Sequence, residues 1–140
     1  LLACRSPHSF LGIDQDGRSC IVKTRGNPDT HLDQRGGGGK TNYHADEVAE
    51  AAAKLRAAGL PEMIMVDCSH ANCAKVAVRQ AEVWKDLLEQ RKKPDCPVIG
   101  AMLESFIEEG NQPIRAGLKY GLSITDPCID WNMTEQLLRM

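Results

Sequence analysis

The chain has 140 residues, the length of one ordinary domain. Apolar residues make up 42% and charged residues 26%, a balance typical of globular proteins rather than of disordered segments. The net charge is −2, so the chain lacks the basic field of a general nucleic-acid binder. No apolar run approaches the roughly 20 residues of a membrane helix, and the opening Leu1–Ala3 is too short for a signal peptide. We therefore expect a cytoplasmic protein that binds neither nucleic acid nor membrane.

The first predicted element is a β-hairpin over residues 10–30. Phe10–Ile13 is a short apolar run, and Asp16-Gly17 is a dipeptide that favours a tight turn. Ser19–Thr24 then has the composition of a strand.

Arg35 precedes four consecutive glycines and Lys40. The stretch before it, residues 31–34, has Leu32 as its only apolar residue and is a poor candidate for a buried strand. Glycine N–H groups can form a nest for an anion, and a guanidinium offers a planar fork to phosphate or carboxylate. Arg35 is therefore the candidate anion-binding residue. A solvated arginine on a surface loop is the alternative.

The rest of the chain alternates between helical periodicity and short apolar runs. Such runs are typical of strands buried on both faces of a parallel sheet, so the pattern predicts an α/β fold. The predicted elements are, in chain order, a helix over 46–58, a strand over 63–66, a helix over about 75–90, a strand over 97–103, a loop over 105–118, an extended piece over 122–125, and a helix that opens near Asn132 with Glu135 completing a capping box.

Three potential metal ligands follow the strand-like segments. His70 comes shortly after the first buried strand, Glu104 directly after the second, and Asp126 after the extended piece. Because the carboxyl ends of parallel strands meet at one edge of a sheet, we expect these side chains to converge. Nitrogen and oxygen ligands suit Mn, Fe, Co or Zn. The alternative is three separate structural roles: a hydrogen-bonded histidine, a capping glutamate and a turn-forming aspartate.

Two other site hypotheses remain open from the residues. One is a zinc-stabilised binding module without catalytic function, in which the ligands would be Cys68, His70 and Cys73. Structural zinc sites have a second pair of ligands elsewhere in the chain, and that pair is missing here. The segment that ends in Lys40 resembles the end of a nucleotide-binding P-loop. Gln34, however, stands where that motif requires glycine.

Four sequence motifs together resemble one enzyme family. They are Arg35–Gly37 with Thr41–Tyr43, Met65–Asn72, Glu104-Ser105 with Glu109–Gln112, and Tyr120–Asp126. In this order they are similar to the C-terminal part of the class I 3-deoxy-7-phosphoheptulonate synthases, over about Pro7 to Met140. Phe10–Ile13 and Gly26–Asp29 are most similar to the tyrosine-sensitive branch.

The resemblance implies a (β/α)8 TIM barrel with an inserted β-hairpin, of which this chain is the C-terminal portion. Residues 1–140 would be a partial barrel domain, with 10–30 as the inserted hairpin and 31–140 as the last βα units. The implied reaction condenses phosphoenolpyruvate with erythrose 4-phosphate, releasing phosphate, as the first step of the shikimate pathway.

The resemblance also implies roles for particular residues. His70, Glu104 and Asp126 match three ligands of a divalent metal ion, and Arg35 matches an arginine that binds phosphoenolpyruvate. For the full-length protein it implies a homo-oligomer that is feedback-regulated by an aromatic amino acid.

Several departures from the family pattern accompany this resemblance. A full barrel needs about 250 residues, and the family's fourth metal ligand, a cysteine, belongs to a region upstream of the matched part. We therefore expect the chain to be a fragment that is inactive and aggregation-prone alone. Locally, Leu32–Gln34 replaces an apolar strand, and Pro127 stands where the family has a small residue. Either departure can weaken the site.

Overall fold

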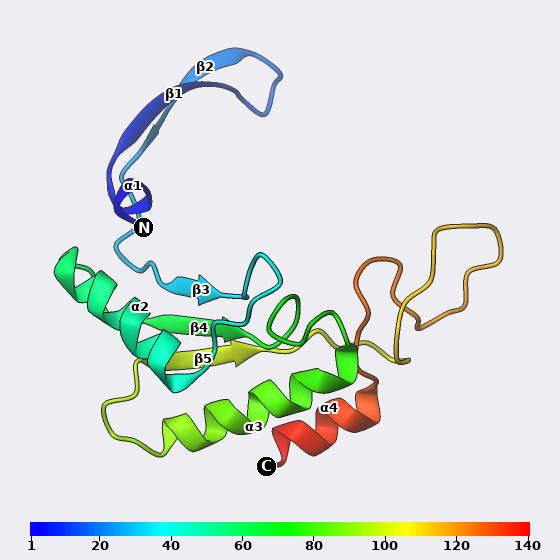
Figure 1. The fold of residues 1–140 in the computed structure, drawn as a ribbon. Helices are drawn as coiled ribbons and strands as arrows, with labels where there is room; N and C mark the ends of the chain where they lie inside the picture. The colour runs from blue at the N-terminus through cyan, green and yellow to red at the C-terminus, as the bar shows by residue number, and fades with distance from the viewer.

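The computed structural model describes residues 1–140, and its N-terminal part projects away from the rest as a β-hairpin (Figure 1). A short helix, α1 (Leu2–Arg5), precedes two antiparallel strands, β1 (His8–Ile13) and β2 (Ser19–Thr24). The second strand has the predicted bounds, whereas the first begins two residues earlier than expected.

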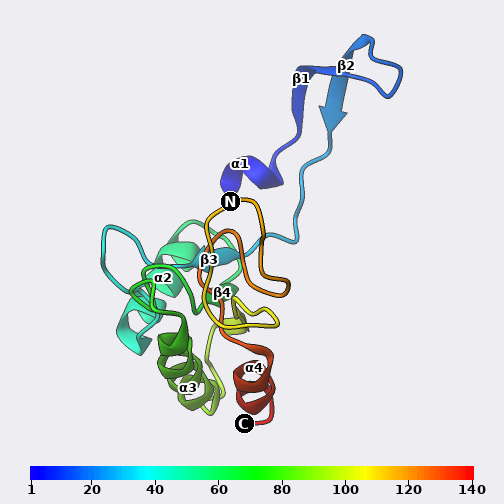
Figure 2. The same ribbon diagram turned by 90° about the vertical axis from the view of Figure 1, so that its right-hand side faces the viewer.

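The hairpin exposes large apolar side chains. Leu11 and Ile21 are direct partners across the two strands, and they are 73% and 63% exposed. Figures 1 and 2 show the same separation from two sides: the strands extend beyond the body, and α1 lies at their base.

The body is built on a three-stranded parallel sheet in the order β3 (Leu32–Gln34), β4 (Ile64–Asp67) and β5 (Val98–Met102). The sequence pattern did not indicate β3. Backbone pairing forms this strand: Leu32 N–H donates to the Met63 carbonyl at 2.9 Å, and the strand runs in register with β4. A short edge strand tolerates polar residues better than a central one, so Asp33 stays exposed.

Helices connect the strands and keep them parallel. α2 (Ala45–Ala57) lies between β3 and β4 in the chain, and the 3-10 turn η1 (Ala77–Arg79) with α3 (Gln80–Arg91) lies between β4 and β5. α4 (Trp131–Leu138) packs beside α3 beneath the sheet (Figures 1 and 2), where Trp84 Nε1 donates to the Leu137 carbonyl at 3.0 Å.

The hydrophobic core lies between the sheet and the helices, on one face of the sheet. Ile64, Val66 and Cys68 alternate along β4 and its end, and all three are fully buried in this core. The expectation of strands buried on both faces is wrong for β5, where Ile99 is 51% and Met102 38% exposed. The physical reason is that the helices cover only one face.

Two helix starts differ from the predicted ones. α3 begins at Gln80 rather than near Lys75, because Ala74 and Lys75 have φ of 52° and 59°, which no α-helix accommodates. α4 begins at Trp131, and its N-cap is Asp130, whose Oδ1 accepts from Met133 N–H at 2.7 Å. The predicted box at Asn132 and Glu135 is therefore wrong: Asn132 already lies inside the helix.

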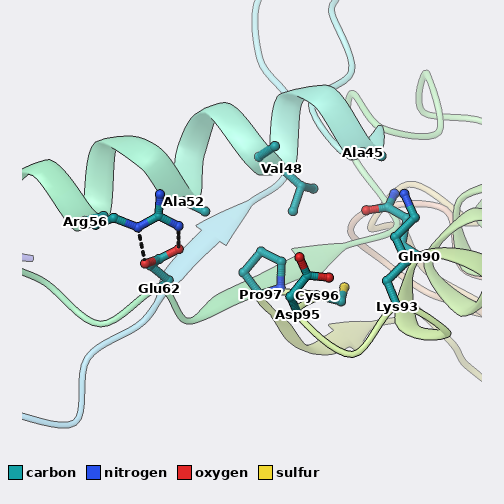
Figure 3. A pocket seen from close by; sticks show the side chains of 11 residues that line it. Ala45, Val48, Ala52, Arg56, Glu62, Gln90, Lys93, Asp95, Cys96 and Pro97 are labelled. Carbon is teal, nitrogen blue, oxygen red and sulfur yellow. Dashed lines mark hydrogen bonds and ion pairs between the residues drawn. The ribbon is translucent and has the colours of Figure 1, made fainter.

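A cavity of about 310 Å³ lies at the amino-terminal edge of the sheet, between α2 and the segments that lead into β4 and β5 (Figure 3). Arg56 closes one side by two hydrogen bonds of 2.6 Å to the Glu62 carboxylate. None of the candidate ligands lines this cavity. None of the helices combines the length and apolarity needed to cross a membrane.

Candidate metal centre

The candidate ligands gather at the carboxyl-terminal edge of the parallel sheet, opposite the cavity of Figure 3. His70 lies three residues after the end of β4, and Glu104 lies two residues after the end of β5. Asp126 comes from the long segment between β5 and α4. As predicted, one imidazole and two carboxylates meet at one edge.

The distances within the group are short. His70 Nε2 lies 3.3 Å from Glu104 Oε1, and His70 Nδ1 lies 3.9 Å from Asp126 Oδ2. One ligand atom from each of the three residues lies within 4.8 Å of the others. His70 and Glu104 are mostly buried, at 20% and 28% side-chain exposure, whereas Asp126 is 57% exposed on the solvent side.

Asp67 is a third acidic residue at this site, beside His70, Glu104 and Asp126. Its Oδ2 lies 3.3 Å from His70 Nε2, and its Oδ1 accepts from the backbone N–H and the hydroxyl of Ser69 at 2.8 and 2.6 Å. These bonds hold the Asp67 side chain within the turn that presents His70. The sequence showed Asp67 at the strand end, but its contact with His70 depends on the path of this turn.

His70 itself has a left-handed backbone conformation, with φ of 52°. Its carbonyl accepts from Lys75 N–H at 2.8 Å and closes the turn. Non-glycine residues rarely adopt this conformation, and they retain it where surrounding contacts compensate for the strain.

Burial raises the pKa of the Glu104 carboxyl, and the carboxylates of Asp126 and Asp67 raise it further. The nearby His70 and a hydrogen bond from Ser69 oppose this shift. A cation between the carboxylates would relieve their mutual repulsion. The electrostatics of the group therefore favour a bound positive charge.

The segment that carries Asp126 is fastened to Glu104 by backbone hydrogen bonds. Ile129 N–H donates to the Glu104 carbonyl at 3.0 Å, and Phe106 N–H donates to the Ile129 carbonyl at 3.0 Å. The predicted extended piece over 122–125 forms no strand; it contributes a single parallel bridge between Asn111 and Ser123.

Arg35 follows β3 at the same edge of the sheet, and its side chain is exposed and free of hydrogen bonds and ion pairs. The next residue, Gly36, donates its N–H to Asn42 Oδ1 at 2.7 Å. Asn72 then accepts from Asn42 N–H at 2.9 Å and donates to the carbonyls of Gln34 and Asp67. Asn72 thereby ties the glycine loop to the turn that carries His70.

The structure does not support the zinc-module alternative. Cys68 is fully buried in the hydrophobic core, and burial raises the pKa of its thiol to about 12. Cys73 directs its Sγ to the His70 carbonyl at 3.6 Å. The potential metal ligands that the structure brings together are His70, Glu104 and Asp126, and neither cysteine belongs to this group.

The P-loop alternative also disagrees with the structure. Gly37 and Lys40 pair through two 3.0 Å backbone hydrogen bonds, so the glycines form a tight hairpin turn. α2 begins at Ala45, so Lys40 does not lead directly into a helix N-terminus, as the P-loop requires.

The three candidate residues fit a divalent transition metal ion. Imidazole nitrogen and carboxylate oxygen bind such ions at about 2.0–2.2 Å, so two ligands of one ion lie no more than about 4.4 Å apart. The separation of at most 4.8 Å therefore requires only small side-chain movements to hold an ion.

We compared the chain with known protein families and with individual proteins. The model of the DAHP synthetase I family matches residues 1–139. The Trp-sensitive phospho-2-dehydro-3-deoxyheptonate aldolase of Salmonella typhimurium is 47% identical over 97% of this chain, which spans 39% of that relative. The Tyr-sensitive enzyme of Enterobacter agglomerans is 45% identical over 98% of the chain, which spans 65% of it.

A solved structure shows the same likeness. Phospho-2-dehydro-3-deoxyheptonate aldolase from Francisella tularensis has a TM-score of 0.92 and 36% identity over 98% of this chain, which corresponds to 40% of that protein. Trp- and Tyr-sensitive relatives match almost equally, so the assignment to the tyrosine-sensitive branch stays a prediction. The whole-length match of the family model and the level of identity show that this chain belongs to the DAHP synthetase I family.

Proposed function

We propose that this chain carries the metal-binding part of an enzyme that condenses phosphoenolpyruvate with erythrose 4-phosphate. The product is 3-deoxy-arabino-heptulosonate 7-phosphate, and phosphate is released. The observation that carries the proposal is the convergence of His70, Glu104 and Asp126 within 4.8 Å at the carboxyl edge of a parallel sheet. Family membership supports it, since the matched relatives are named for this aldolase activity.

The residues take distinct roles in this proposal. His70, Glu104 and Asp126 hold a divalent ion of Mn, Fe, Co or Zn, which supplies Lewis acidity or an activated water when bound. Asp67 and its Ser69 bonds keep the His70 ring in place. Arg35, with its unpaired guanidinium at the same sheet edge, holds the anionic phosphoenolpyruvate in orientation for attack.

The larger architecture belongs to the same proposal. The three βα units over residues 31–140 would be the last part of a (β/α)8 barrel, and β1 and β2 would be a hairpin inserted into it. Parallel order β3-β4-β5, with helices on one face, is the arrangement that a barrel repeats. Regulation by an aromatic amino acid, a homo-oligomeric state and a cytoplasmic location complete the proposal.

Metal titration of single variants tests the centre. His70→Ala, Glu104→Ala and Asp126→Ala should each weaken Mn²⁺ or Co²⁺ binding by more than about tenfold, because each removes one ligand. Glu109→Ala removes a nearby exposed acid outside the group and should leave binding unchanged. Isothermal titration with the metal alone measures the affinities. The proposed centre would be refuted if metal binding survived all three substitutions, or if it were lost in Cys73→Ala instead.

A further inference from the structure

Gln80 is a fully buried amide beside the metal centre, at the first residue of α3. Its Nε2 donates to the Glu104 carbonyl at 3.0 Å, and its Oε1 accepts from the Glu104 N–H at 2.8 Å. Both ends of one side-chain amide therefore bind the backbone of one candidate ligand residue.

The two hydrogen bonds of Gln80 extend the hydrogen-bonding pattern of the sheet beyond the end of its strands. The β4–β5 ladder closes with Cys68 N–H donating to the Met102 carbonyl at 2.9 Å, so Glu104 lies beyond the last strand pairing. The Gln80 amide pairs with the Glu104 backbone as a neighbouring strand would. The position of Glu104 is thus set by α3 as well as by β5.

The same hydrogen bonds extend to the segment that carries Asp126. The Glu104 carbonyl accepts from Ile129 N–H as well as from Gln80, and Ile129 is fully buried. Gln80 therefore supports the backbone through which both carboxylate ligands are placed. No charged group of Gln80 is involved, so the effect is one of position rather than of local charge.

We propose that Gln80 is a positioning residue of the metal centre, which it serves by holding the Glu104 backbone so that the carboxylate stays beside His70. The inference rests on the proposed function, since it takes Glu104 to be a ligand. The competing explanation is that Gln80 only stabilises the fold, as any buried hydrogen-bonded amide does.

Gln90 provides a matched control on the same helix. It is also buried, at 8% exposure, and its Nε2 donates to the Tyr43 carbonyl at 2.8 Å and to the Asp86 carboxylate. It lies in the last turn of α3, away from the ligands. Replacing either glutamine by methionine keeps the length of the side chain and removes its hydrogen bonds.

The experiment titrates the 140-residue chain and its Gln80→Met and Gln90→Met variants with Co²⁺ alone, by calorimetry and by the visible absorption of the bound ion. Gln80→Met should weaken affinity by about tenfold or more, at unchanged stoichiometry and with an altered Co²⁺ spectrum. Gln90→Met should keep the wild-type affinity and spectrum even where urea unfolding shows an equal loss of stability.

The outcomes separate the two claims. If the wild-type chain does not bind Co²⁺, the proposed metal centre fails and this inference fails with it. If the wild type binds and both methionine variants bind equally well, or lose affinity only in proportion to the unfolded fraction seen by circular dichroism, Gln80 has no positioning role. Should Gln80→Met fail to fold, Gln80→Asn keeps the amide but is one methylene too short to reach both groups, and the same comparison applies.

Discussion

Position 36 has no room for a side chain. A Cβ there would lie 2.7 Å from the Lys40 carbonyl oxygen and 2.8 Å from Ala71 Cβ, and the φ of Gly36 is +69°. Ala71 is the neighbour of His70 in the chain, so this close approach joins the glycine loop to the turn that carries His70. The requirement for glycine at this position is therefore steric as well as conformational.

Two glycine variants separate these requirements. Gly38 also has a positive φ, of +57°, but a Cβ there would meet open space. Gly38→Ala should cost about 1 kcal/mol for the left-handed backbone, and Gly36→Ala about 3 kcal/mol because the clash adds to it. Urea unfolding measures both free energies. Equal losses would mean that the loop does not pack against the His70 turn as described.

The Cys68 thiol supplies a residue-scale prediction about pH. Burial raises its pKa from 9.0 to about 12, so the folded chain holds this proton more tightly than the unfolded chain. The resulting stability is fully present below about pH 9 and is lost as the pH rises toward 12.

Reactivity toward a thiol reagent checks the state of Cys68. At pH 8, peptide mapping should find exposed Cys4 alkylated rapidly, and Cys68 alkylated only after denaturant is added. Labelling of Cys68 at the rate of Cys4 in the folded chain would contradict its burial.

At the scale of elements, the start of α4 distinguishes the observed cap from the predicted one. Asp130→Ala removes the acceptor for Met133 N–H and should destabilise the chain by about 1 kcal/mol. Asn132→Ala alters an exposed position inside the helix and should be neutral within about 0.5 kcal/mol. Thermal unfolding of the two variants compares them directly. If Asn132→Ala destabilised the chain more than Asp130→Ala, the helix would be capped at Asn132, as the sequence predicted.

Helical periodicity and apolar runs were sufficient to predict α2, β4, β5 and the parallel order of the last two strands. They were not sufficient for β3, because an edge strand with Asp33 and Gln34 is formed by pairing with β4 and not by its own composition. The sequence pattern also did not predict that α3 begins only at Gln80. The left-handed conformations of Ala74 and Lys75 depend on the turn that closes at the His70 carbonyl.

The candidate site shows the same division between local and tertiary information. The proximity of His70 and Glu104 results from the order of β4 and β5, which the sequence pattern indicates. Asp126 is placed instead by backbone hydrogen bonds of a segment that forms no strand. The contacts of Asp67 and Gln80 with this group arise from a particular turn and from the docking of α3. No sequence spacing signals them, so they emerge only from the structure.

At the scale of the whole molecule, the projecting hairpin predicts how the isolated chain behaves. Replacing exposed Leu11 and Ile21 together by threonine removes apolar surface and places β-branched residues, which suit strands, at both positions. The double variant should raise the monomeric fraction, measured by size-exclusion chromatography with light scattering.

A control pair on the same strands completes this test. Ser9→Thr with Ser19→Thr changes exposed polar positions and should leave the monomeric fraction as it is. If the apolar pair has no greater effect than this control, self-association proceeds through another surface, such as the open edges of the sheet.

The three candidate ligands leave the ribosome one after another, and the position of the last of them depends on residues that are synthesised after it. Asp126 is held through Ile129, and Ile129 is buried against Leu137 of α4. While α4 remains in the exit tunnel, the nascent chain can present His70 and Glu104 but cannot yet fix the position of Asp126. The proposed centre should therefore be complete only after α4 has emerged, and a ribosome stalled before that point should display a centre of low affinity.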